Sequence, residues 1–345
     1  MSTTTVSSRS TVEGGTPPRK FVDNLLRLRE LSIIGVLVVL VVITELGDHR
    51  FLSTQGIKDL LLNATILVLV AVGEAVVVIS RNVDLSVGSV LGISAFAAGD
   101  YLSAGGNAVI AVLIAIAVGL VFGLLNGVLV SFGRVPALVV TLGTLYVIRG
   151  IDSLWVGSRE VAASNLPAGF IGFGHNGLGA IPYLALIAVV AMVVVGYYLR
   201  SYRSGREMYA LGSNPEAARL AGVQVRKRVI AAYVLGGALA GLAGALYLAR
   251  FGNVDSGTGT GYELTVVSAV VVGGVAFTGG SGSVYGAALG ALLLTSINSM
   301  LPSLGVSSVW EQAIDGFLLL LAIAIDRIVA LRVADTLRRR TARRA

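Results

Sequence analysis

Long apolar segments separated by short polar connections run along most of the chain. A helix needs roughly 20 apolar residues to cross a hydrocarbon core about 30 Å thick, and segments of that kind recur from Leu31 to Ile325. We expect ten spans, at residues 31–46, 60–79, 86–104, 108–131, 136–156, 180–199, 229–250, 264–277, 284–302 and 309–326. The predicted fold class is therefore all-α, a polytopic membrane bundle of about ten transmembrane helices.

Two stretches interrupt this pattern with residues that a regular helix disfavours. Residues 79–89 read ISRNVDLSVGS, and residues 264–283 end in VVGGVAFTGGSGS. Irregular backbone at membrane depth is tolerated only where protein covers it or where it lines a watery cavity, so we expect some broken or re-entrant segments. For the glycine cluster, a plain tight turn between two ordinary spans is an equally good interpretation.

Composition supports the membrane assignment. Of 345 residues, 55% are hydrophobic and 13% charged, and the mean hydropathy is +0.85, which is typical of an integral membrane protein. Glycines recur every four residues at Gly119, Gly123 and Gly127, at Gly237 and Gly241, and at Gly282, Gly286 and Gly290. Small residues at this spacing share one helix face and let helices approach closely, so we interpret them as packing seams rather than as chemistry.

The positive charge is concentrated in three zones. Of 26 Lys and Arg residues, 19 lie before the first span, between residues 200 and 228, or beyond residue 326. The positive-inside rule places all three in the cytoplasm. The predicted organisation is thus a cytoplasmic tail (1–30), a transmembrane domain (31–326) with a cytoplasmic loop at 200–228, and a basic cytoplasmic tail (327–345). The excess charge indicates orientation and contact with membrane lipid, not nucleic-acid binding.

The sequence lacks the groups that most catalytic and metal sites need. It has no cysteine, and its two histidines, His49 and His175, lie in polar connections, so thiolate chemistry and a His-based metal cage are excluded. No phosphate-binding lysine motif or nucleophile elbow occurs. We therefore expect a transport subunit with no catalytic and no metal residues, and any ATP would bind to another subunit.

Polar residues inside apolar spans are costly and are functional hypotheses by default. Glu74 and Asn126 lie deep in the second and fourth spans, and Thr141 and Thr144 share one face of the fifth. For each threonine, a bond back to its own helix is the simpler interpretation. For Glu74 we favour a buried, partnered or protonated carboxyl over a proton relay, because no second deep acid is evident.

The loop from Arg200 to Arg228 contains a short helix. Asn214 precedes Pro215 as a helix start, EAARLA is a strong helix former, and Gly222 ends it. A helix of two turns is not stable alone in water. We expect it to dock on a partner protein, with the lipid headgroups as the alternative.

Four stretches together resemble the permease subunits of bacterial ATP-binding-cassette importers for ribose and related sugars. They are RNVDLSVGS (81–89), VPALVVTLGTLYVIRGI (135–151), YALGSNPEAARLAGV (209–223) and GTGYELTVVSAVVVGGVAFTGGSGSVYGAALGALLL (259–294). The resemblance covers about residues 51–326, and the Arg-Asn form of the first motif and the TGTGYEL run are most similar to the autoinducer-2 and rhamnose branch.

The resemblance implies a set of partners in the bacterial cytoplasmic (inner) membrane. These are two cytoplasmic ATPase subunits or one fused double ATPase, a second permease copy or a homologous permease, and an extracytoplasmic sugar-binding protein. ATP and Mg²⁺ would bind to the ATPase and no cofactor to this chain. The 205–222 helix would couple to the ATPase through Gly205, Gly212, Asn214, Pro215, Glu216, Ala217, Ala218 and Gly222.

The resulting hypothesis is a permease whose polar groups form the path for a monosaccharide or sugar-like molecule. The candidate path residues are Glu74, Asp84, Ser86, Asn126, Thr141, Thr144 and Glu263. We also expect Asp84 to cap the helix that follows it, with Ser86 and Ser89 satisfying further first-turn N–H groups. The alternative is a secondary transporter driven by an ion gradient, which predicts inverted repeats and paired acids at the midplane.

Overall fold

A computed structural model describes residues 19–47, 49, 51–133, 135–157, 159–307 and 309–324. The helices are α1 (Arg19–Gly47), α2 (Thr54–Ile79), α3 (Val87–Ser103), α4 (Ala108–Gly133), α5 (Ala137–Val156), η1 (Ala163–Asn165), α6 (Ala168–His175), α7 (Tyr183–Ser201), α8 (Arg203–Ser213), α9 (Pro215–Leu220), α10 (Val225–Phe251), α11 (Tyr262–Val272) and α12 (Val284–Ser303). Strands β1 (Gly177–Leu178) and β2 (Ile181–Pro182) form a two-stranded antiparallel hairpin, and residues 310–324 are also helical.

The predicted all-α membrane bundle is confirmed. A helix occurs at each of the ten expected spans, and six of the described helices are long and apolar enough to cross a membrane. The segment before α7 holds α6 and the hairpin, which the apolar pattern did not predict. Because Pro182 closes the hairpin and lies just before α7, that helix begins at Tyr183 rather than at residue 180.

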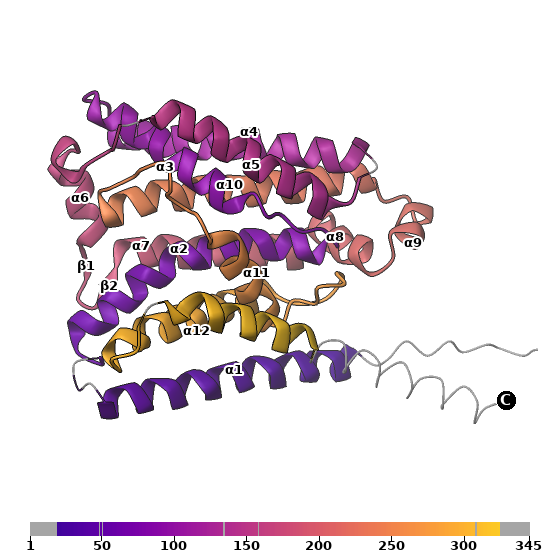
Figure 1. Cartoon of the computed structure of the whole chain (residues 1–345). Helices are drawn as coiled ribbons and strands as arrows, with labels where there is room; N and C mark the ends of the chain where they lie inside the picture. The colour runs from indigo at the N-terminus through magenta and orange to yellow at the C-terminus, as the bar shows by residue number, and fades with distance from the viewer. Residues whose placement is uncertain are drawn as a thin grey trace, which may run out of the picture.

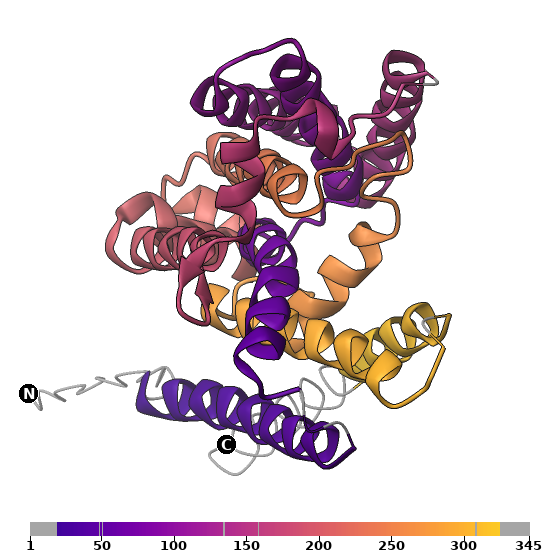
Figure 2. The same ribbon diagram turned by 90° about the vertical axis from the view of Figure 1, so that its left-hand side faces the viewer.

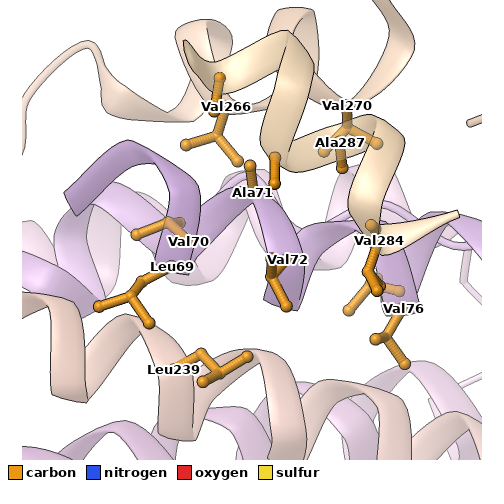
Figure 3. Close-up of a cluster of buried hydrophobic side chains, with 14 of the residues drawn as sticks. Leu69, Val70, Ala71, Val72, Val76, Leu239, Val266, Val270, Val284 and Ala287 are labelled. Atoms are coloured by element: carbon orange, nitrogen blue, oxygen red, sulfur yellow. The ribbon is translucent and has the colours of Figure 1, made fainter. Parts of the chain in front are cut away.

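Helix α2 lies at the centre of the bundle, packed against α7, α10, α11 and α12. From Leu69 to Ile79 every residue of α2 is buried, and all of them except Glu74 are apolar, as expected for a helix segment enclosed on all sides. Figure 3 shows Val70 and Val72 of α2 between Leu239 of α10 and the side chains of α11 and α12. By contrast, α4, α5 and α7 leave many Val and Leu side chains exposed, as expected for helices that face lipid.

The glycine seams hold helices together, as predicted. Gly119 and Gly123 of α4 lie against Gly237 of α10 so closely that a Cβ on either side would overlap the facing backbone. On α12, Gly286 and Gly290 meet the backbone at Gly273 in the same way. Gly282 was expected to continue this seam, but it lies before α12 with φ of 122° and belongs to the connection instead.

The two ends of the bundle carry different elements (Figure 1). Helices α8 and α9 lie at one end, whereas α6 and the hairpin lie at the other. The view in Figure 2 shows α1 along one side of the molecule, where it packs against α12. The candidate functional site described below has two parts. One part lies inside the bundle, and the other lies at the end that carries α8 and α9.

Candidate functional site

The chain breaks between α2 and α3, as the ISRNVDLSVGS motif predicted. Arg81 adopts the left-handed conformation (φ 66°) that usually requires glycine, and the N–H groups of Arg81 and Asn82 donate to Val78 O (2.9 Å) and Val77 O (3.1 Å). Residues 82–86 then turn back into the bundle, and α3 starts at Val87. The break therefore brings Asp84 and Ser86 into contact with α2 and α4.

Five of the seven candidate path residues meet around this break. Asp84 Oδ1 accepts hydrogen bonds from the N–H (2.9 Å) and the hydroxyl (2.6 Å) of Ser86. Asn126 Nδ2 donates to Ser86 Oγ at 2.7 Å and lies 3.4 Å from both carboxylate oxygens of Asp84. The N–H of Asp84 donates to Glu74 Oε1 at 3.0 Å. We call Glu74, Asp84, Ser86, Asn126 and Thr141 the polar cluster.

The carbonyl of Val83 ties the polar cluster to two more helices. It accepts from the hydroxyl of Tyr233 on α10 (3.0 Å) and from Thr141 Oγ1 on α5 (3.3 Å). Thr141 also donates to Ala137 O, and Thr144 donates to Thr141 O. Both threonines thus bond back to their own helix as the simpler interpretation predicted, and Thr144 reaches the polar cluster through the backbone carbonyl of Thr141.

Three details of the sequence prediction are wrong. Ser86, not Asp84, occupies the N-cap of α3 and makes no side-chain cap, because Asp84 precedes it by two residues and takes its N–H and hydroxyl. Ser89 donates to Leu145 O on α5 instead of capping. Glu74 does have a second deep acid beside it, since the break folds Asp84 back onto α2 across ten residues of sequence.

Glu263 lies apart from the polar cluster, at the start of α11. The segment from Gly252 to Gly261 returns into the bundle along α3, where the Gly88 and Gly92 positions leave no room for a side chain against its backbone. Arg149 fixes this segment by donating to Thr258 O at 2.7 Å. Glu263 Oε1 accepts from the N–H of Gly261 at 3.3 Å. The short α11 therefore begins inside the bundle, and the expected broken segment is confirmed.

The 200–228 loop forms two helices rather than one. Asn214 ends α8 and caps α9, with its side chain accepting from the N–H of Ala217 at 3.0 Å, and Pro215 occupies the first helical position. Gly222 follows α9 with φ of 82°, and the N–H of Val223 reaches Ala218 O at 3.0 Å. The predicted start and stop signals of the helix are confirmed.

Burial divides the predicted coupling residues into two groups. Glu216, Ala217 and Gly222 are exposed at the tip, whereas Ala218, Gly205 and Gly212 are buried against the chain itself and position the helices. Sequence reasoning missed Leu220, which is 84% exposed. Leu220 lies outside the apolar spans, in a short helix whose start and end are marked in the sequence. A large apolar residue at such a place is a signal for a contact surface that the sequence did contain.

Glu207 anchors α8 to the start of α10. Its carboxylate accepts from Arg203 Nε at 2.8 Å and from Arg228 Nε at 2.7 Å. These hydrogen bonds hold the pKa of Glu207 below its usual value. These three charges are separated by up to 25 residues of sequence, so their spacing gave no signal that they would meet.

The end of α8 contacts both breaks of the transmembrane domain. The N–H of Gly280 donates to Ile79 O at 2.9 Å, and the Tyr209 hydroxyl donates to Gly282 O at 3.1 Å. A side chain at Gly212 would overlap both the Ile79 carbonyl and the Gly280 backbone. We call Gly212, Ile79 and Gly280 the three-way junction. The junction places the end of α8 against Ile79, the residue directly before the 80–86 break that carries Asp84.

Comparisons with known proteins agree on one family. The family model described as branched-chain amino acid transport system / permease component matches residues 56–323. The chain is 35% identical over 320 residues to the autoinducer 2 import system permease protein LsrC of Escherichia coli O9:H4 (strain HS), covering 93% of this chain and 92% of that protein. It is 36% identical, over 93% of this chain and 91% of the relative, to the protein of the same name from Salmonella paratyphi B.

Proposed function

This chain belongs to the permease-component family of branched-chain amino acid transport systems, and from that premise we infer that it is the membrane-spanning subunit of an ATP-binding-cassette importer in the bacterial inner membrane. As a transport subunit it performs no covalent chemistry. In this proposal ATP and Mg²⁺ bind to partner ATPases, of which there are two or one fused double subunit. A second permease copy or a homologous permease completes the membrane part, and an extracytoplasmic binding protein delivers the solute.

The observation that carries this proposal is the α8–α9 structure. A six-residue helix would not persist alone, yet here it is capped by Asn214, closed at Gly222 and backed by α8, which Glu207 holds against α10. It presents Leu220 to the outside at the end of the bundle. These features suit a rigid helix that inserts into a groove of an ATPase on the cytoplasmic side.

The three-way junction supplies the route from the ATPase to the solute path. When the ATPases close on ATP, α9 moves with them, and α8 transmits the movement to Ile79 and Gly280 through backbone contacts. Ile79 leads directly into the break that carries Asp84 and Ser86. We propose that rearrangement of the polar cluster opens and closes the path, which we expect to include Thr144 and Glu263 beside it.

The proposed solute is a small sugar-like molecule of the ribose, rhamnose or autoinducer-2 type. Its class follows from the relatives, which are named for import of autoinducer 2. One observation favours the alternative of an ion-driven transporter: Glu74 and Asp84 are two buried acids joined by a hydrogen bond from the Asp84 backbone N–H to the Glu74 carboxylate. Such a pair suits cation or proton coupling, so the experiment must separate the two functions.

The test is to express the tagged chain together with its neighbouring reading frames, purify it in mild detergent and quantify co-purifying ATPase by mass spectrometry. Leu220→Asp places a charge on the exposed tip and should strongly reduce the amount of ATPase captured, because the groove would have to bury that charge. The matched control is Leu178→Asp in β1, which is 65% exposed at the opposite end and should leave capture unchanged.

Two results would contradict the proposal. One is equal capture of ATPase by wild type and Leu220→Asp. The other is a homo-oligomer without ATPase that accumulates solute in proteoliposomes when only an ion gradient is applied. The second result would establish the ion-driven alternative, with Glu74 and Asp84 as the coupling acids.

A further inference from the structure

A cavity of about 730 Å³ lies at the end of the bundle away from α8 and α9. Its walls come from the first half of α2, the beginning of α11 with the segment before it, the second half of α12 and residues 311–315 of the last described helix. The volume falls in the range of small-molecule sites. The cavity is lined by none of the residues of the polar cluster, although it includes Gly261, whose N–H donates to the candidate path residue Glu263.

The cavity contains two acceptor atoms that no group of the described chain satisfies. Asp315 is 7% exposed, and its Oδ2 accepts from Thr265 Oγ1 at 2.9 Å while its Oδ1 has no partner. Asn298 Oδ1 on α12 is likewise buried and without a partner. Buried polar atoms are normally hydrogen-bonded, so a ligand that fills this cavity should bring donors to these two oxygens. Hydroxyl groups meet that requirement.

The charge of the walls argues against an anionic ligand. No Lys or Arg is among the described residues that line the cavity, and within the described part of the chain Asp59 is the one lining acid with an ion pair, to Arg250 at 3.3 Å. Glu311 and Asp315 have no such partner among the described ion pairs. A phosphate or carboxylate group would therefore meet uncompensated negative charge. Most of the remaining polar lining consists of neutral Asn, Gln, Ser and Thr side chains, which can donate hydrogen bonds to and accept them from the hydroxyl groups of a neutral ligand.

Aromatic rings complete the fit to a compact ring-shaped ligand. Phe251 and Tyr262 are among the lining residues, together with Asn298 of α12 and Asp315 of the 310–324 helix. A monosaccharide has apolar C–H faces and an edge of hydroxyl groups, and aromatic rings beside polar side chains suit those two surfaces.

We propose that this cavity is a binding site for a neutral polyhydroxy compound of monosaccharide size, held through Asp315 and Asn298. The inference rests on the proposed function, since it names the substrate class of the importer and gives the solute a site within one permease subunit. Because the cavity lies at the end of the bundle opposite α9, it is the place where an incoming solute first contacts the permease.

The absence of cysteine from the sequence makes the site directly testable. Ser299→Cys puts a single thiol in the cavity wall, and Ser164→Cys puts one on the exposed η1 outside it. Both are made in the full chain, purified in mild detergent and labelled with the neutral reagent N-ethylmaleimide. D-ribose and L-rhamnose are the neutral probes, and choline is the cationic probe.

We expect at least one of the two sugars to slow labelling of Ser299→Cys without affecting Ser164→Cys, and choline to have no effect. Adding Asp315→Asn should keep the labelling rate without sugar but raise the half-protecting sugar concentration about tenfold or more, because a charge-assisted hydrogen bond is lost. Asn298→Ala is the second variant should Asp315→Asn fail to fold. Protection by choline alone, by neither sugar, or to an equal degree in Asp315→Asn would overturn the inference.

The labelling assay does not depend on the ATPase, so the two proposals can fail separately. If ATPase capture and ATP-driven uptake succeed while no sugar protects Ser299→Cys, the proposed sugar site in the cavity is refuted and the proposed importer function is supported. If ATPase capture fails while a sugar still protects the cysteine, the proposed importer function is refuted and the sugar site in the cavity is supported.

Discussion

Replacing Asn214 by alanine should weaken coupling to the ATPase without disturbing the membrane bundle. The Asn214 side chain accepts the N–H of Ala217 at 3.0 Å and is the N-terminal cap of a helix only six residues long. Loss of such a cap costs about 1 kcal/mol. The Glu216–Arg219 ion pair on the same helix cannot compensate, because both side chains are largely exposed.

The expected change in the affinity of the permease for its ATPase follows from this free energy. If α9 must be helical to dock, about 1 kcal/mol lost from the docked conformation raises the dissociation constant of the ATPase about fivefold. The measurement is titration of the purified permease with its ATPase, followed by ATP-driven uptake in proteoliposomes. Uptake should fall when the ATPase is subsaturating and recover when it is in excess.

The matched control is Asn214→Ser, which keeps a side-chain acceptor at the same position. It should bind the ATPase nearly as tightly as wild type. The reasoning would be refuted by equal losses in Asn214→Ala and Asn214→Ser, since the cap would then not be the cause. It would also be refuted by an alanine variant indistinguishable from wild type at every ATPase concentration.

Three further predictions concern packing and electrostatics. Gly237→Leu should lower the melting temperature of the purified chain by an amount equivalent to about 1–3 kcal/mol or more, because it overlaps the facing backbone of α4, whereas Gly143→Leu on an open face of α5 should not. Tyr233→Phe removes a buried hydrogen bond and should cost about 1–2 kcal/mol by the same measurement, while the exposed Tyr146→Phe should cost nothing measurable. The pKa of Glu207 is lowered from 4.5, so its ion pairs stabilise the protein above about pH 4.5 and are lost as the pH falls through the lowered pKa. Glu207→Gln should therefore lower the melting temperature at pH 7 and shrink the difference between pH 7 and pH 4; a variant with an unchanged difference would contradict this account.

The sequence contains strong signals for the helices of this protein, because each span must be about as long as the membrane is thick. It also predicts the Asn214 cap and the glycine seams, since both are local patterns. The sequence does not reveal which distant residues come together when the chain reverses its direction. Glu74 and Asp84 meet only because Arg81 turns the backbone, and Asn298 and Asp315 face one cavity only because α12 and the last helix pack beside α11.

The glycine contacts between α4 and α10 have a consequence for how the protein moves. Where backbone lies directly on backbone, there are no side-chain rotamers to exchange, so the two helices have one close-packed arrangement and behave as a single rigid body. Conformational change must then be absorbed at the joints, and the described chain offers them at 80–86, 252–261 and 273–283. The α4–α10 pair is in this sense a rigid frame, and one of the three irregular segments around it carries Asp84 and Ser86 of the polar cluster.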